Sequence, residues 1–416
     1  MSAKKQTSED VTKLLAGVVV LDLSRVLAGP WATQFLGDLG AEVIKIERPG
    51  RGDDTRQWGP PFVRSPNGGA GDAAYFQCAN RNKKSVGIDF SKSEGAAAVR
   101  AIAKKAHILV ENFKVGDLAR KGLDYQSIAS INPGIVYCSI TGFGQSGPHS
   151  GKAGYDFMIQ AMAGLMSVTG QPEGEPGIGP TKVGVAVSDI FAGMYAAASI
   201  LAALRHAERT GKGQHIDVAL FDCQVATLAN QASNYLTSGH APTRLGNAHP
   251  SIAPYESFFA SDQPFILAVG NDSQFTNLCR AIGAPELADD ARFSTNPVRV
   301  VNRNALRPAL EPLLMKKTAR QWLEILANAG VPAGPINSVD VALADPQISA
   351  RNLLEGDASD IGSATPPFMR HPVKYSSTPA HRPSRPPELG ADTDEILHSF
   401  LTSDEIAALK SAGASE

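Results

Sequence analysis

Short apolar, β-branched segments alternate with helical segments through the first third of the chain, and this alternation constrains the fold more than any other feature. Strands are expected at 17–24, 41–48, 84–90, 107–113 and 134–141, with helices at 30–40 and 93–106. Such an alternation is typical of a parallel α/β sheet of the doubly wound kind. We therefore expect this sheet to form the core of a large domain.

The later part of the chain has a different pattern. A hairpin at 255–261 and 265–270, with helices near 272–283, 303–314 and 318–329, predicts a smaller α+β domain. The other expectations are long helices at 188–210 and 220–238, a loop at 48–74, an arm kept extended by seven prolines at 366–387, and a last helix at 392–411. We divide the chain into 1–225 (large α/β domain), 226–330 (small α+β domain) and 331–416 (return linker and C-terminal part of the large domain).

The composition limits the compartment and the partners. The net charge of the 416 residues is −2, without a Lys/Arg-rich block, which disfavours nucleic acid or an anionic membrane as the main ligand. Four widely spaced cysteines exclude a disulfide framework and fit a reducing compartment. The first 15 residues lack an apolar signal core, and Glu9 and Asp10 count against a presequence. We expect a cytoplasmic protein.

Three common catalytic or cofactor motifs are either absent or stand in the wrong context. The segment GFGQSG (142–147) matches GxGxxG, but Pro148 follows it instead of a helix, which disfavours a dinucleotide site. GQSGP is not the GxSxG of a nucleophile elbow. The nine histidines show no HxxxH or HExxH, so no metal site is expected.

Basic and amide side chains fall near the ends of the expected strands. Ligands of open α/β sheets bind beyond the C-terminal strand ends, so these side chains together indicate a phosphate-bearing ligand. The alternative is a solvated edge of the sheet. The residues concerned are Arg48, Lys83, Asn112, Lys114 and Arg120.

Asp189 is the only charged side chain between Val183 and Leu204. Either Ser188 or Asp189 could cap the helix that follows, since both residue types accept hydrogen bonds from free amides of a first turn. A carboxylate at a helix N-terminus is also held ionised by the helix dipole, and it is then suited to act as a nucleophile. The two interpretations are compatible.

The chain resembles the class III CoA-transferases, a family that includes formyl-CoA:oxalate and carnitine CoA-transferases and, as a branch, α-methylacyl-CoA racemases. The resemblance implies a Rossmann-like large domain built from both chain ends, a smaller α+β domain, and an interlocked homodimer. It is carried nearly end to end by LDLSRVLAGPWATQFLGDLGAEVIKIERPGRGDDTR, NRNKKSVGIDF, VENF, SITGFGQSGPHSGKAGYDFMIQAMAGLMSVTG, VSDIFAGMYAAASILAAL, RTGKGQHIDVALFD and RLGNAHPSIAPYESF.

The resemblance implies that Asp189 is the catalytic nucleophile, which attacks an acyl-CoA thioester and later carries CoA as an aspartyl thioester. No permanently bound cofactor is implied, because the CoA thioester is itself a substrate. The implied CoA-binding positions are Leu27, Ala28, Arg48, Ile88, Asp89, Asn112, Phe113, Lys114, Arg120, Tyr155 and Asp156. A lysine that some members carry two residues before the tyrosine is Ala153 here, with Lys152 adjacent.

The segment LGNAHP (245–250) stands where family members have a glycine-rich loop over the site. It holds one glycine, Gly246, followed by Asn247 and His249, which argues against oxalate or formate and for succinyl-CoA with a dicarboxylic acceptor. His249 or Arg244 would meet the second carboxylate of the acceptor. The alternative for His249 is a structural hydrogen bond within the loop.

The racemase branch offers a contrast at one position. Racemases carry a histidine in a GHD motif, whereas this chain reads GYD at 154–156. A tyrosine with its ordinary pKa near 10 is a poor base at neutral pH, so a transferase is favoured. A racemase or epimerase, and a CoA-binding protein without catalysis, remain the alternatives.

Overall fold

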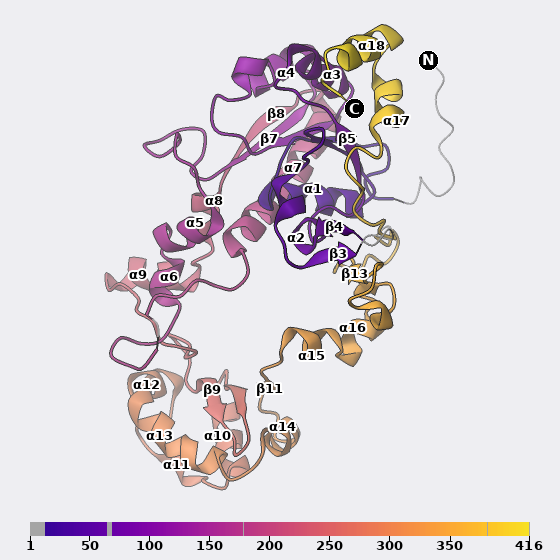
Figure 1. Ribbon diagram of the computed structural model, residues 1–416. Helices are drawn as coiled ribbons and strands as arrows, with labels where there is room; N and C mark the ends of the chain where they lie inside the picture. Colours follow the sequence, from indigo (N-terminus) through magenta and orange to yellow (C-terminus); the bar gives the residue numbers. More distant parts are fainter. Residues whose placement is uncertain (1–12, 65–68, 178, 381, 416) are drawn as a thin grey trace. The chain divides into compact units, whose positions relative to one another are not determined.

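The computed structural model describes residues 13–64, 69–177, 179–380 and 382–415, which form two compact units (Figure 1). Residues 1–12, on which the expectation about a presequence rests, lie outside the described residues. The large unit takes its described residues from Met1–Gly164, Val183–Leu228 and Gln347–Glu416, and the small unit from Leu165–Lys182 and Ala229–Pro346. Both ends of the chain therefore contribute to the large unit, as the family resemblance implies.

A six-stranded sheet with the order β5-β2-β1-β6-β7-β8 forms the centre of the large unit. All neighbouring strands are parallel, which confirms the expected sheet. The order reverses between β1 and β6, and this reversal defines the switch point at which doubly wound sheets bind ligands. The strands are β1 (Val19–Asp22), β2 (Glu42–Glu47), β5 (Lys83–Gly87), β6 (Ile108–Glu111), β7 (Val136–Thr141) and β8 (Gln214–Ala219).

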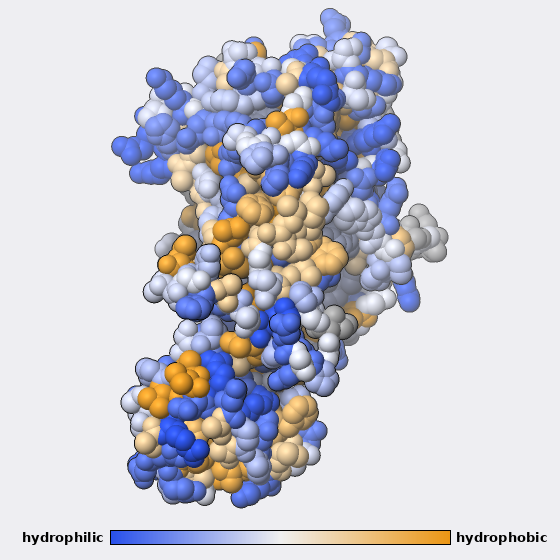
Figure 2. All heavy atoms as spheres, turned by 90° about the vertical axis from the view of Figure 1, so that its left-hand side faces the viewer, coloured by the Kyte–Doolittle hydropathy of each residue, from blue (hydrophilic) through white to orange (hydrophobic). Residues whose placement is uncertain are grey.

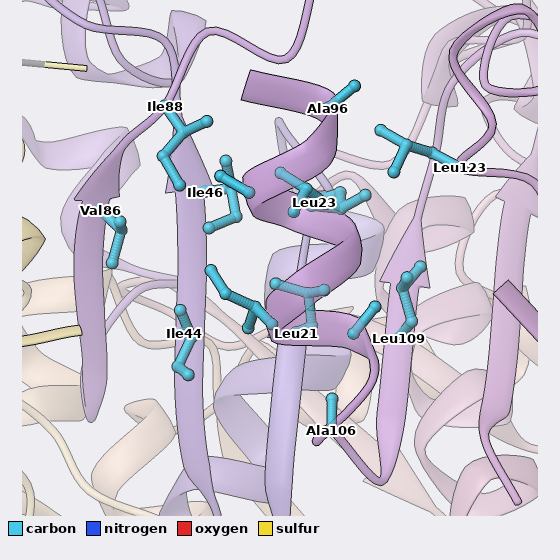
Figure 3. Packing of buried hydrophobic residues seen from close by; sticks show 14 of the residues in the cluster. Leu21, Leu23, Ile44, Ile46, Val86, Ile88, Ala96, Ala106, Leu109 and Leu123 are labelled. Atoms are coloured by element: carbon cyan, nitrogen blue, oxygen red, sulfur yellow. The ribbon is translucent and has the colours of Figure 1, made fainter. Parts of the chain in front are cut away.

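Helices cover both faces of this sheet, because successive strand residues point to opposite sides. Val20 joins the core beneath α1 and α7, whereas Leu21 joins the core beneath α3, which Figure 3 shows. The first face holds α1 (Ala28–Asp38), α5 (Asp156–Met162), α7 (Val187–Thr210) and α8 (Leu220–Ala226). The second holds α3 (Ser93–Ala103), α4 (Tyr125–Ile131), α17 (Thr393–Phe400) and α18 (Ser403–Ser411).

Within the part of the chain that the structure describes, α7 is the one helix long and apolar enough to cross a membrane by length and composition. Its Ala192, Ala196 and Ile200 are completely buried in the core of the large unit.

The C-terminal segment returns to the sheet beside β5 and α3 (Figure 1). The backbone N–H groups of Ser85 and Gly87 donate to the side chains of Asp392 and Thr393, each over 2.9 Å. The single helix expected at 392–411 is wrong: α17 ends at Phe400, and Thr402 starts α18 with a capping box to Glu405.

The segment 48–74 is not the irregular loop that its glycines and prolines predicted. It contains the 3-10 helix η2 (Asp54–Gln57) and the hairpin of β3 (Phe62–Arg64) and β4 (Ala70–Ala73). Other short elements of the chain are α2 (Ala74–Gln77), η3 (Ala119–Lys121), α16 (Pro346–Ala350), β12 (Leu354–Glu355), η4 (Ala358–Asp360) and β13 (Phe368–Met369).

The small unit packs helices against an antiparallel sheet of β9 (Tyr255–Phe259), β10 (Pro264–Ala268) and β11 (Ala333–Pro335). The expected hairpin is confirmed, and the expected helix at 220–238 is wrong. It is interrupted after α8, because Ala229 adopts a left-handed φ of 47°. The helices here are α6 (Leu165–Val168), α9 (Asn230–Ser238), α10 (Asp272–Ala281), α11 (Glu286–Asp289), α12 (Asn296–Val301), α13 (Arg303–Leu314), α14 (Ala319–Asn328) and α15 (Val339–Leu343).

Candidate active site

Two adjoining cavities open at the carboxyl edge of the parallel sheet, at its switch point. The Asp189 cavity, of about 320 Å³, is lined by the turn after β1, the segment after β6, and Tyr155, Lys152 and Asp189. The Arg48 cavity, of about 360 Å³, is lined by Arg48, Arg51, Ile88, Asp89 and Lys121 among others. Arg25 and Phe113 line both, so the two cavities are neighbours within the large unit.

The turn after β1 is held in an uncommon conformation. Val26 has a φ of 71°, which a β-branched residue rarely adopts. Asn112 accepts from the Arg25 N–H over 2.9 Å and donates to the Arg25 carbonyl over 2.6 Å, while Asp53 accepts from the Val26 N–H over 3.3 Å. A strained backbone persists only where its surroundings hold it, so Asn112 and Asp53 shape this wall of the site.

Buried ion pairs lie beneath that turn. Lys83 Nζ is 3.1 Å from Asp22 Oδ2, and Lys45 Nζ is 3.0 Å from Asp53 Oδ2, with all four side chains completely buried. Burial alone would raise the pKa of Asp22, but Lys83, Lys45 and the hydroxyls of Ser24 and Thr33 hold it below its usual range. These charges are paired inside the protein, and Lys45 and Asp53 also form part of the lining of the Arg48 cavity.

Asp189 lies in the first turn of α7 and lines the cavity named after it. The expectation that Ser188 or Asp189 caps the helix is wrong, because Ala186 is the N-cap residue and has no capping side chain. Asp156 at the start of α5 supplies the acceptor instead, since its Oδ1 accepts from the Ser188 N–H over 2.8 Å. The carboxylate of Asp189 is thus left out of the capping.

Burial and the like charge of Asp156 raise the pKa of Asp189 to about 7. Across the described ranges, no hydrogen bond or ion pair to its side chain is found. The sequence-based expectation was a carboxylate held ionised by the helix N-terminus. The structure instead favours the neutral form of Asp189, because partial burial disfavours the charged form and Asp156 contributes a second negative charge nearby. About half of the groups are therefore ionised near pH 7.

The structure brings most of the expected CoA-binding residues to this site. Ala28, Asn112, Phe113, Lys114 and Tyr155 line the Asp189 cavity. Arg48, Ile88 and Asp89 line the Arg48 cavity, with Phe113 shared between the two.

Four expected residues line neither cavity. Leu27 is buried before α1, Asp156 accepts from the Ser188 N–H, and Arg120 of η3 pairs with Asp117, which itself lines the Asp189 cavity. Lys83 is not available to a phosphate, because it begins β5 and its ammonium group is enclosed by Asp22, the Pro30 carbonyl and Asn80.

The three expected substrate residues belong to the small unit. Gly246 has a φ of 59° and its N–H donates to the Gly170 carbonyl over 3.1 Å. The Asn247 side chain donates to Ser257 Oγ over 3.0 Å. His249 Nδ1 accepts from the Ser251 N–H over 3.0 Å, so in the neutral ring Nε2 carries the proton.

Tyr75, which lines neither cavity, lies within electrostatic reach of Asp189 and was not predicted from the sequence. Burial and the negative charge of Asp189 are the first two causes that raise the pKa of Tyr75 to about 12, which places its hydroxyl within electrostatic reach of Asp189. Trp58 packs edge to face on Tyr75, with ring centroids 5.4 Å apart. Both come from the glycine- and proline-rich region, and the exposed Trp58 was the one available indication of function there.

The described residues contain no group of three or more His, Cys, Asp or Glu side chains that could hold a metal ion.

Doubly wound α/β sheets bind their ligands at the switch point, where this structure has the two cavities and the Asp189 carboxylate. The chain belongs to CoA-transferase family III, and the sequence model of that family matches residues 15–393. It is therefore an acyl-CoA:carboxylate CoA-transferase.

Three comparisons bear this out. A succinate–glutarate CoA-transferase of Agrobacterium fabrum is 48% identical over 94% of this chain and 97% of its own length. An acetyl-CoA:oxalate CoA-transferase of Acetobacter aceti is 43% identical over 89% of this chain and 92% of its own. The crystal structure of a CAIB/BAIF family protein from Brucella suis superposes with a TM-score of 0.82 at 48% identity, covering 94% of this chain and 100% of that one.

Proposed function

We propose that the protein transfers coenzyme A from succinyl-CoA to a dicarboxylic acid through a covalent intermediate on Asp189. The observation that carries this proposal is the carboxylate of Asp189 at a family III ligand site, without a hydrogen-bonding partner among the described residues. The name of the Agrobacterium fabrum relative, a succinate–glutarate CoA-transferase, supports succinate and glutarate as the two acids between which CoA is exchanged.

The shape of the site suits an elongated ligand. Arg48, Arg51 and Lys121 provide positive charge in the Arg48 cavity for the phosphates of the CoA nucleotide, while Ile88 and Phe113 offer apolar surface. The pantetheine arm would then pass Arg25 and enter the Asp189 cavity. In this pose the thioester reaches Asp189 at the far end of the site.

Each step of the reaction transfers an acyl group between a carboxylate oxygen and the sulfur of CoA. An Asp189 oxygen bonds to the succinyl carbonyl carbon and CoA thiolate leaves, which gives a mixed anhydride. The thiolate attacks the Asp189 carbonyl carbon and releases succinate, which leaves an aspartyl-CoA thioester. The acceptor carboxylate then attacks that carbon and expels the thiolate, and the thiolate finally takes the acceptor acyl group and frees Asp189. No net proton and no water are consumed.

His249 and Arg244 are the two residues that we propose for binding the second carboxylate of the acceptor. His249 Nε2 is the protonated nitrogen of the neutral ring, so it is suited to donate to a second carboxylate. Arg244, whose Nε donates to the Gln171 carbonyl over 2.9 Å, is the other candidate. The Acetobacter aceti relative uses oxalate, so acceptors from oxalate to glutarate belong in one assay panel.

A homodimer is the proposed assembly. Large apolar side chains remain exposed on α5, α7 and α8 of the large unit, and Figure 2 shows apolar residues gathered on one face. A monomer rarely leaves so many together. Light scattering should therefore report twice the chain mass. The exposed residues are Tyr155, Phe157, Met158, Met162, Phe191, Met194, Tyr195 and Val225.

The cytoplasm is the proposed location. All four cysteines are free in the structure, which is compatible with a reducing compartment. Fractionation of the source cells with an antibody to the protein would test this assignment.

The covalent intermediate is tested by mixing the protein with succinyl-CoA, trapping with hydroxylamine and analysing peptides by mass spectrometry. A modification at Asp189 that disappears in Asp189→Ala is expected, together with a loss of turnover of about 10³-fold or more. An unmodified Asp189 in a protein that binds CoA would contradict the proposal. Exchange of the α-proton of a 2-methylacyl-CoA with deuterium would then identify a racemase instead.

A further inference from the structure

Asp156 lies at the start of α5, and both of its carboxylate oxygens accept hydrogen bonds from protein donors. Oδ1 accepts from the Ser188 N–H over 2.8 Å, and Oδ2 accepts from the Gln160 side chain over 2.8 Å. Asp156 lines neither of the two cavities. Its place therefore differs from that of a residue that contacts CoA.

Gln160 extends this contact to the chain that leads into α7. Its side chain is completely buried, and its Oε1 accepts from the Val183 N–H over 2.9 Å. Asp156 and Gln160 thus hold the chain at two points, one before α7 and one in its first turn. A helix start leaves amide donors that need such acceptors, and α7 has no capping side chain of its own.

Ser188 is also fixed from the other side. Its Oγ donates to Gln224 Oε1 of α8 over 2.8 Å, and both side chains are buried. The residue that precedes Asp189 is therefore held through its backbone by α5 and through its side chain by α8. With no hydrogen bond found at the Asp189 side chain in the described ranges, the position of its carboxylate depends on how this first turn is held.

We propose that Asp156 is a positioning residue, which fixes the first turn of α7 and whose negative charge favours the covalent state of Asp189 over its free carboxylate. The proposal rests on the covalent role of Asp189. When the Asp189 oxygen bonds to the acyl carbon, the negative charge leaves with the CoA thiolate. The repulsion between Asp189 and Asp156 ends at that step, which promotes acylation.

Other titratable groups also lie near Asp189. Tyr75 of α2 lies within electrostatic reach, and the Asp189 cavity contains Arg25, Lys114, Asp117 and Lys152. Asp156 is the charged neighbour that raises the pKa of Asp189 in addition to burial. Removing the charge of Asp156 should therefore lower that pKa, whereas removing only the Gln160 contacts should not.

Two variants separate these effects. Asp156→Asn can keep the acceptor for the Ser188 amide but loses the charge. Its acidic limb of kcat/KM should move about one pH unit down, and its fraction of CoA-loaded Asp189 should fall about tenfold at equal succinyl-CoA. Gln160→Met keeps the charge and loses the contacts, so kcat should fall about tenfold without a downward shift of the limb. KM for succinyl-CoA should change little in either.

A matched control is Asp357→Asn, because Asp357 accepts from the Ser359 N–H at the start of η4 and lines neither cavity. It should leave the pH profile unchanged. An unshifted acidic limb in Asp156→Asn, or an effect confined to KM for succinyl-CoA, would overturn the proposal. Wild-type kcat in Gln160→Met would overturn the positioning role even if Asp156→Asn failed to fold. Absence of an adduct in the wild-type protein would instead refute the covalent function itself.

Discussion

Asp22 and Asp189 are two shielded carboxylates of the large unit, and the protein treats them in opposite ways. Asp22 accepts from the hydroxyls of Ser24 and Thr33 and pairs with Lys83. Asp189 has no such partner in the described ranges and faces the like charge of Asp156. The pKa of Asp22 is lowered, and the pKa of Asp189 is raised to about 7.

This difference separates a structural carboxylate from the proposed nucleophile. A buried charge that is fully paired stabilises one arrangement and has no free electron pair to offer. A shielded charge that is unpaired is held at high free energy, and covalent bonding to an acyl carbon relieves it. The comparison can be tested by removing the pairing at Asp22 and by titrating or neutralising Asp189.

The largest expected effect comes from breaking the Asp22 pair. Lys83→Met leaves Asp22 buried without its closest opposite charge, which should lower the free energy of unfolding by about 3–5 kcal/mol, measured by urea denaturation. Asp22→Asn with Lys83→Met removes both charges and should recover part of that loss. Lys84→Met is the control, since Lys84 makes exposed bridges to Glu42 and Glu395 worth about 1 kcal/mol or less. An equally small loss in Lys83→Met would contradict the comparison.

The pH dependence of acylation should be the next largest effect. Asp189 must be ionised to attack, so kcat/KM for succinyl-CoA should rise about tenfold per pH unit below about 7 and then level off. Rapid-quench measurement of the covalent adduct between pH 5 and 9 would follow this limb. Binding of an unreactive CoA thioether over the same range controls for titration of the ligand. A limb near pH 4 would show that the helix N-terminus dominates, as the sequence alone suggested.

The sequence allowed the sheet to be predicted, because its strands depend on local patterns, whereas the role of Asp189 as nucleophile is implied by the family resemblance and stays a prediction. Apolar runs such as GVVVLDLS form strands wherever a parallel sheet buries both faces. The strand β8 was missed because Gln214, His215 and Asp217 make it polar, and its pairing with β7 depends on distant residues. The interruption at Ala229 has no glycine or proline to mark it.

The contacts around Asp189 could not be predicted from the sequence, because they are made by residues that lie far apart in the chain. Ser188 and Asp189 are good capping residues by type, yet the acceptor comes from Asp156, 32 positions away from Ser188. Likewise, Tyr75 reaches Asp189 only through the folded chain. Local preference identifies which residues can cap or react, whereas tertiary contacts decide which of them do so.

The smallest effect expected is on stability, and its sign distinguishes the two carboxylates. The pKa of Asp189 is raised from 3.8 to about 7 in the folded protein, so between these pH values the folded protein binds more protons than the unfolded protein. The contribution of Asp189 to the free energy of unfolding is therefore greatest below about pH 4 and falls as the pH rises to about 7. Asp189→Asn removes this cost. After allowing for the water that reaches this group, we expect a gain of about 1 kcal/mol at pH 8 and a smaller gain at pH 5, measured by urea unfolding. Asp22→Asn should instead destabilise at both pH values, because it removes a carboxylate that its partners favour in the charged form. A loss of stability in Asp189→Asn at pH 8 would mean that Asp189, like Asp22, has its charge compensated in the folded protein.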